Sequence, residues 1–187
     1  MRFWTVTSEW QAQLEDRNSR FLAHIVPFAV FDQTLTDLKS AHRKANHHVT
    51  AFRTMQDDNR IIEGAKDDGE PAGTSGMPIL KILQGHALVD VGVIVVRYFG
   101  GTKLGGGGLA RAYSGATARA IEAADLVLWQ RIISKTFSCT FPDISPLEAD
   151  VERLKLTVLA RQFSESGQTV MVSGPEDQIK KLAQSWK

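Results

Sequence analysis

Cysteine is nearly absent from this chain, and a long apolar run is absent altogether. The 187 residues include one cysteine, Cys139, so no disulfide can form within the chain. This usage is typical of a protein from a reducing compartment. The longest strongly apolar run is 91–96, ended by Arg97, whereas a membrane span needs roughly 20 such residues. We therefore expect a cytoplasmic protein with no membrane partner.

A charge excess of either sign is also missing. Lys and Arg number 22 and Asp and Glu number 21, which gives a net charge of +1. Nucleic-acid-binding proteins usually carry a basic excess, so any anion-binding surface here has to be local. The hydrophobic content of 43% and the charged content of 23% are ordinary for a globular chain and argue against a disordered one.

Motifs for catalysis and for metal binding are lacking as well. The sequence contains no HExxH, CxxC or GxSxG segment. Ser75 and Ser114 have no placed base, and Cys139 lies among core residues with no basic neighbour, so a catalytic thiolate is not expected. We therefore expect no catalytic residue and no metal ligand set, and the sequence favours a non-enzymatic function over an enzyme.

Hydrophobic patterning predicts an α+β chain of two domains, residues 1–132 and 133–187. In the first, we expect strands at 20–26, 47–52, 60–63 and 89–99 and helices at 34–45, 77–83 and 109–124. The apolar strand at 89–99 has the pattern of a central strand covered on both faces. Thr34 and Asp37 fit a capping box for the first helix, and Asn46 can close it.

The second domain follows a different pattern. Apolar residues alternate with polar ones around Cys139, which predicts a half-buried strand. A helix beginning near Ser145, a hairpin of 158–163 with 168–173, and a helix at 175–186 follow. The order strand, helix, strand, strand, helix predicts a small α+β sandwich.

A glycine-rich loop joins the 89–99 strand to the 109–124 helix. Glycine permits close backbone approach by a ligand, and a helix start adds unpaired N–H groups and a partial positive charge. Together these features predict an anion site. Its backbone is expected to come from Gly100, Gly101, Gly105, Gly106, Gly107 and Gly108.

Cations and an aromatic residue accompany these glycines. Arg97 ends the strand, Lys103 lies in the loop, and Arg111 is placed in the first turn of the helix. Their mutual repulsion requires a compensating negative charge, either an external anion or the acidic loop that precedes them in the chain. Tyr98 is the better candidate for stacking on a base, whereas Phe99 and Tyr113 fit the core.

The acidic loop is shaped by glycine and proline. Its carboxylates offer oxygen ligands for Mg²⁺, the one cofactor that the sequence suggests, although a turn with solvated acids is the simpler interpretation. We expect it to support the glycine-rich loop through Asp67, Asp68, Gly69, Glu70, Pro71, Gly73 and Thr74.

Two adjacent histidines, His47 and His48, fall on a predicted strand. Their side chains point to opposite faces, so they cannot chelate one metal from a regular strand. One of them can face the glycine-rich loop.

Four segments together resemble the Impact family, in particular its bacterial YigZ branch. The segments read SRFLA from Ser19, ANHHVTAF from Ala45, DDGEPAGTSGMPIL from Asp67 and VVRYFGGTKLGGGGLARAY from Val95. The resemblance implies a first domain like those of a ribosomal protein and GHMP kinases, with a split β-α-β fold. A weaker resemblance from Ser134 onward implies a ferredoxin-like second domain.

The resemblance also bears on function. Eukaryotic Impact proteins regulate translation by restraining a kinase, and proposals for bacterial members centre on nucleic-acid or ribosome binding. We therefore expect a binder of RNA or of the ribosome. Two alternatives stay open: a nucleotide-binding protein or Mg²⁺-dependent enzyme acting on a phosphorylated small molecule, and a protein–protein regulator of translation control.

Overall fold

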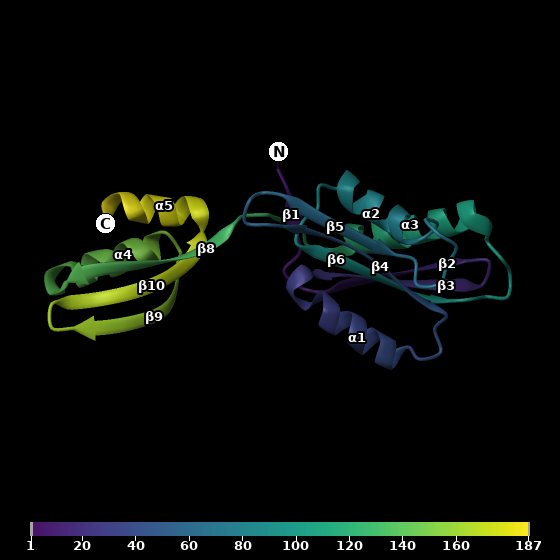
Figure 1. Cartoon of the computed structure of the whole chain (residues 1–187), viewed down its shortest axis with the longest axis horizontal. Helices are drawn as coiled ribbons and strands as arrows, with labels where there is room; N and C mark the ends of the chain where they lie inside the picture. Colours follow the sequence, from purple (N-terminus) through teal and green to yellow (C-terminus); the bar gives the residue numbers. More distant parts are fainter. Residues whose placement is uncertain (1, 187) are drawn as a thin grey trace. The chain divides into compact units, whose positions relative to one another are not determined.

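The computed structural model describes residues 2–186 and contains two compact units, Met1–Trp129 and Gln130–Lys187 (Figure 1). The sequence pattern places the boundary after residue 132 instead. The difference arises because Ile132 already pairs with Pro175 in the second unit. The carbonyl of Arg131 likewise accepts a hydrogen bond from the amide of Glu176. Within the described residues, no helix is both long and apolar enough to cross a membrane.

The first unit is built on a five-stranded antiparallel sheet with the order β2-β3-β6-β4-β5. The strands are β2 (Trp10–Asp16), β3 (Ser19–Pro27), β4 (His47–Met55), β5 (Ile61–Lys66) and β6 (Val91–Tyr98). A short pair, β1 (Trp4–Thr5) with β7 (Val127–Leu128), lies outside this sheet. Strands β3 and β4 both run antiparallel to β6, so they are parallel to each other. They are joined through α1 (Phe31–Ala41), which is the expected split β-α-β arrangement.

Helices cover both faces of this sheet (Figure 1). On one face lie α2 (Gly76–Gly85) and α3 (Gly105–Ala123), and on the other lie α1 and the short η1 (Phe28–Val30). The prediction of a central apolar strand is confirmed, because β6 is the middle strand and its residues 91–97 are all buried. Side chains at alternating positions of β6 point to opposite faces of the sheet and belong to different cores. Val93 packs toward α2 and α3, and Ile94 packs toward α1.

Two predicted helix starts in this unit were wrong. Helix α1 begins at Phe31 rather than Thr34, and the hydroxyl of Thr34 donates to the carbonyl of Val30 from within the helix. Asn46 does not close α1. It accepts a hydrogen bond from the amide of Phe99 instead. Helix α3 begins at Gly105 rather than residue 109. The sequence pattern missed this first turn, because glycines carry no side chains and so give no hydrophobic periodicity.

The second unit is a three-stranded antiparallel sheet with two helices. Its strands are β8 (Ile132–Thr140), β9 (Thr157–Ser164) and β10 (Gly167–Pro175), in the order β8-β10-β9. Its helices are α4 (Ile144–Arg153), which follows the short η2 (Phe141–Asp143), and α5 (Glu176–Ser185). Their apolar faces close a separate core of Phe137, Leu147, Val170, Val172 and Ile179, among others. The predicted order of elements and the β9–β10 hairpin are confirmed.

Candidate functional site

The first turn of α3 consists of four glycines, Gly105–Gly108, exposed except for Gly108. The residue before the helix, Leu104, makes no side-chain cap, and no acidic residue lies in the first turn. The first N–H groups of a helix have no partner within it, and the helix dipole favours negative charge at this end. The turn therefore offers open backbone donors on a surface of positive potential.

The chain before this turn has a shape that requires glycine at two positions. Gly105 has a φ of +70°, in the left-handed region that L-residues rarely adopt. A Cβ on Gly100 would collide with the backbone of Asn18. These two glycines let the chain leave β6, pass close to the β2–β3 turn and enter α3.

A pocket of about 300 Å³ opens beside the start of α3. It is lined by Glu70, Pro71, Arg97, Phe99, Lys103, Leu104, Gly105, Gly106 and Leu109. The residues come from the acidic loop, the end of β6 and the start of α3, so the structure brings together the two loops that the sequence singled out. Gly100, Gly101, Gly107 and Gly108 lie nearby in the chain but do not line the pocket.

The floor of this pocket is a buried, neutralised ion pair. The Nη1 of Arg97 donates to Oε1 of Glu70 at 2.6 Å, and both side chains are buried. The hydroxyl of Tyr113 donates to the same oxygen at 2.8 Å. Burial raises the pKa of Tyr113 well above its ordinary value, and Glu70 raises it further, so Tyr113 remains a donor. The charge of Arg97 is therefore neutralised within the fold by Glu70. The sequence had left open whether the acidic loop or an external anion does this.

Lys103 and Arg111 differ from Arg97. Both are exposed, and neither forms an ion pair with another described residue. Arg111 belongs to the second turn of α3 rather than the first. Its Nη1 nevertheless lies 3.6 Å from the position that a Cβ on Gly107 would occupy, so the guanidinium folds back over the glycine turn. Two uncompensated cations therefore flank the start of the helix.

The acidic loop is held by hydrogen bonds to its own backbone. Asp67 accepts from the amides of Gly73, Ser75 and Gly76 at 2.7, 3.1 and 2.8 Å, and so caps the start of α2. Burial alone would raise the pKa of Asp67, but these three amides hold it below its ordinary value. Thr74 donates its hydroxyl to the carbonyl of Pro71.

Asp68 ties this loop to β4. Its carboxylate accepts from the amide of His48 at 2.6 Å, and its carbonyl accepts from Nδ1 of His47 at 2.8 Å. Gly69, with a φ of +88°, turns the chain beside the His47 ring. Because the carboxylates of the loop are engaged with protein donors, its visible role is to shape the pocket. Among the described residues, no group of three or more His, Cys, Asp or Glu side chains is arranged to hold a metal ion.

The two histidines lie on opposite faces of β4. The Nε2 of His47 lies 3.8 Å from Oε1 of Glu70, behind the buried ion pair and outside the pocket lining. Burial lowers the pKa of His48, although the nearby Asp68 carboxylate opposes this, so a neutral ring is favoured. Neither ring reaches the pocket surface.

The structure exchanges the expected roles of Tyr98 and Phe99. Tyr98 lies on the α1 face of β6, where its hydroxyl is hydrogen-bonded to Nδ1 of His42 at 2.8 Å and the guanidinium of Arg20 lies over its ring. It is therefore separated from the glycine turn. Phe99, assigned to the core from sequence, is 45% exposed and lines the pocket. Strand alternation predicts that Tyr98 lies on the opposite face of β6 from Arg97. The sequence pattern did not predict that β6 ends before Phe99, and this follows only from the structure.

Comparison with known proteins agrees with the segments singled out in the sequence. Residues 17–121 match the family model of the Impact N-terminal domain. The IMPACT family member YigZ of Escherichia coli is 31% identical over 153 residues, which cover 80% of this chain and 75% of that protein. YvyE of Bacillus subtilis, another member, is 37% identical over 114 residues, 59% of this chain and 52% of that protein. The chain thus aligns with only about half the length of YvyE.

A solved structure shares the fold across almost the whole chain. The crystal structure of a hypothetical protein superposes with a TM-score of 0.72 at 24% identity and covers 98% of this chain and 90% of that one. At this level of identity the similarity concerns the fold alone.

Proposed function

The chain belongs to the Impact family, and from that premise we propose that its first unit binds RNA, free or exposed on the ribosome, and acts in the regulation of translation. The contact surface is the start of α3, with the pocket beside it. We refer to the glycine turn 105–108, Lys103, Arg111 and Phe99 as the α3 mouth.

The uncompensated charge of the α3 mouth is the observation that carries this proposal. Arg97 is neutralised by Glu70 at 2.6 Å, whereas Lys103 and Arg111 are exposed and have no ion-pair partner among the described residues. A phosphate accepts hydrogen bonds from open helix amides and is attracted by the dipole and by both cations. A chain with a net charge of only +1 therefore has a local surface suited to a polyanion.

The aromatic group of the α3 mouth favours single-stranded RNA over an isolated phosphate. Phe99 is large, apolar and 45% exposed, at the edge of a pocket of about 300 Å³. Unstacked bases bind to such rings, and a cationic groove beside them follows the sugar–phosphate backbone. The guanidinium of Arg97 lies over the face of the Phe99 ring, with Cζ 5.6 Å from the ring centroid, and helps to hold the ring in place.

Fluorescence anisotropy with a labelled single-stranded RNA, run as a salt series from about 50 mM, tests the proposal. We expect log affinity to fall linearly with log salt concentration. Lys103→Glu and Arg111→Glu are each expected to weaken binding about tenfold or more and to reduce the salt slope by about one. Binding that is undetectable at the lowest salt would refute the proposal.

Lys44→Glu provides the matched control. Lys44 is exposed, forms no ion pair with a described residue and follows α1, which lies on the opposite face of the sheet from α3. Its reversal changes the net charge as much as Lys103→Glu does. If the control variant weakens binding as strongly as Lys103→Glu, attraction by overall charge explains the binding and the α3 mouth is not the site. Sedimentation with ribosomes, using the same three variants, extends the test to RNA on the ribosome.

A further inference from the structure

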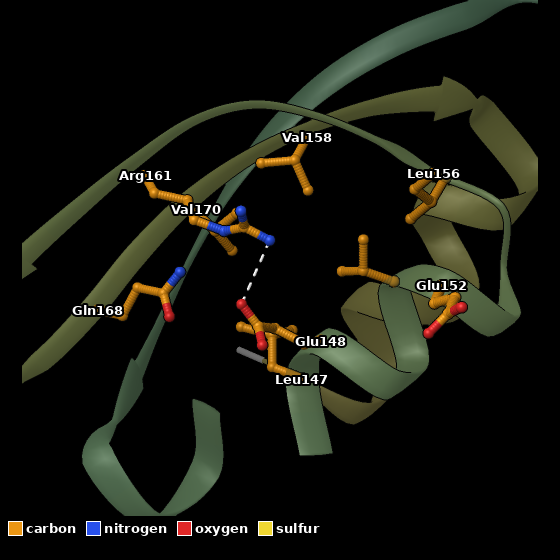
Figure 2. A pocket seen from close by; sticks show the side chains of 9 residues that line it. Leu147, Glu148, Glu152, Leu156, Val158, Arg161, Gln168 and Val170 are labelled. Carbon is orange, nitrogen blue, oxygen red and sulfur yellow. Dashed lines mark ion pairs between the residues drawn. The ribbon is translucent and has the colours of Figure 1, made fainter. Parts of the chain in front are cut away.

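The second unit contains a pocket of about 330 Å³ between α4 and the strands β9 and β10 (Figure 2). This volume lies at the small end of the range for ligand sites. Most of the wall is aliphatic, formed by Leu147, Val151, Leu156, Val158 and Val170. The pocket lies outside the residues matched by the family model and outside the proposed RNA site.

One buried polar side chain borders this apolar wall. Gln168 is 3% exposed and lies on β10, on the same face as Val170 and Val172. Its Oε1 and Nε2 are both inaccessible and have no hydrogen-bond partner among the described residues. Buried polar groups are normally hydrogen-bonded, and this carboxamide offers both an acceptor and a donor. A ligand that supplies a donor and an acceptor together would satisfy it, once the side chains that cover these two atoms have moved aside.

An ion pair crosses the pocket at its polar end. Nη2 of Arg161 on β9 lies 3.2 Å from Oε1 of Glu148 on α4, and each side chain is about half exposed. In Figure 2 the carboxamide of Gln168 lies on one side of this pair and Leu156 lies on the other side, farther away, whereas Val158 is drawn beside the Arg161 guanidinium. A pair so exposed contributes little to stability, so each partner can exchange the other for a charge on a ligand.

We propose that this pocket binds a free α-amino acid with an aliphatic side chain. The α-carboxylate pairs with Arg161, and the α-ammonium pairs with Glu148. Gln168 donates through Nε2 to the carboxylate and accepts through Oε1 from the ammonium. The aliphatic side chain packs against the apolar wall, toward Leu156.

Other small ligands match the pocket less well. A simple anion would sit beside the Glu148 carboxylate, and a simple cation would sit beside the Arg161 guanidinium. An uncharged apolar molecule would leave the Gln168 carboxamide unpaired. A zwitterion whose carboxylate and ammonium are attached to the same carbon atom matches an acid and a base 3.2 Å apart, and an apolar group on that carbon matches the wall.

Isothermal titration calorimetry of the full chain with L-leucine tests the assignment. Three analogues each lack one feature: 4-methylpentanoate lacks the ammonium, 3-methylbutylamine lacks the carboxylate, and glycine lacks the apolar side chain. We expect L-leucine to bind and each analogue to bind about tenfold weaker or not at all. Absence of L-leucine binding up to about 10 mM, or equal binding of any analogue, overturns the proposal.

Variants of α4 test which carboxylate binds the ammonium. Glu148→Gln is expected to weaken L-leucine binding about tenfold. Glu152→Gln is the matched control, because Glu152 also lines the pocket from α4 but its carboxylate lies apart from Arg161 and Gln168 in Figure 2. Equal losses in the two variants would contradict the assigned geometry.

Gln168→Met separates a ligand site from a structural role. Methionine has nearly the same shape but has neither of the hydrogen-bonding groups of the carboxamide. We expect this variant to lose L-leucine binding, with a urea midpoint of the second unit that is unchanged or higher, since an unpartnered buried amide has been removed. Retained binding would show that the carboxamide does not contact the ligand. A lower urea midpoint would show that the carboxamide stabilises the fold.

Discussion

Among single residues, Arg97 shows how a cation next to a candidate anion site is kept from acting as a free charge. Its guanidinium is buried, held by Glu70 at 2.6 Å and stacked near Phe21 and Phe99. Tyr113 completes the arrangement by donating to the same carboxylate. The pair fixes the end of β6 and the acidic loop, so that Phe99 and Lys103 are presented from a defined surface.

Glu70→Gln is expected to destabilise the first unit by about 3–5 kcal/mol, because it leaves the charge of Arg97 buried without a counter-charge. Urea unfolding followed by tryptophan fluorescence measures the loss. Asp58→Asn is the control, since Asp58 pairs with Arg60 on the exposed surface and exposed pairs contribute about 0–1 kcal/mol. Similar losses in both variants would mean that Glu70 and Arg97 are not paired as described.

Asp67→Ala is expected to cost about 1–2 kcal/mol at neutral pH, because the carboxylate caps α2 through three backbone amides. The pKa of Asp67 is lowered in the folded protein, so its contribution is present above the ordinary value of 3.8 and is lost as the pH falls through the lowered value. The stability difference between the parent and the variant should therefore shrink in acid. Denaturation curves at neutral and acidic pH measure it, and a difference that grows on acidification would contradict the capping role.

Phe99→Leu is expected to weaken RNA binding by about 1–3 kcal/mol, the usual contribution of a stacked ring. Tyr98→Leu should leave the affinity nearly unchanged, since Tyr98 lies on the α1 face and bonds to His42. Anisotropy measures both, with circular dichroism to verify folding. The opposite ranking would move the stacking surface to the other face of the sheet.

Among the elements, α3 carries the candidate site because its first turn is made entirely of glycine. Glycine has a low helix propensity, but the remaining fifteen residues of α3 bury Leu109, Tyr113, Ala116 and Ile121 against the sheet. This packing holds the helix, while the exposed turn leaves its amides accessible. The arrangement combines a stable helix with a first turn whose own residues carry no side chains.

Two glycine substitutions in this turn should have opposite effects on stability. Gly105→Ala is expected to destabilise the fold by about 1–2 kcal/mol, because Gly105 has a φ of +70°. Gly107→Ala is expected to stabilise it by about 0.5–1 kcal/mol, because Gly107 has a helical backbone and a Cβ there would make only an ordinary contact at 3.6 Å. Chemical denaturation of both variants gives the two signs. Equal signs would mean that α3 does not start at Gly105.

In the whole molecule, the two units have separate cores. The two clusters of the first unit draw on residues before 130, and the cluster of the second unit draws on residues after it. The proposed RNA site and the proposed amino-acid site belong to different units, so each can be tested by substitutions within its own unit.

Ile79→Ala and Ile179→Ala form a matched pair for the independence of the cores. Each isoleucine lies on a helix and is almost fully buried, at 0% and 1% exposure. Each change is expected to cost its own core about 2–5 kcal/mol. Hydrogen exchange should show faster amide exchange only in the unit that carries the substitution. Faster exchange in both units would show that the chain unfolds cooperatively as one body.

Local patterning determined much of this protein. The central position of β6, the buried face of α3 and the β9–β10 hairpin follow from periodicity and turn residues, which act over a few neighbouring positions, whereas the split β-α-β arrangement was expected from the family resemblance. The grouping of glycines with Lys103 and Arg111 followed from the same local order, and so did the family resemblance, which the comparisons confirm.

Only the tertiary structure decided which charges and rings are available. Glu70 lies twenty-seven residues from Arg97 in the chain, and no local pattern shows that these two neutralise each other while Lys103 and Arg111 do not. The exchange of Tyr98 and Phe99 depended on where β6 ends, and the unpartnered Gln168 depended on how the elements of the second unit pack around β10. Such outcomes depend on contacts between distant segments, since burial and pairing arise only when the sheet and the helices have come together.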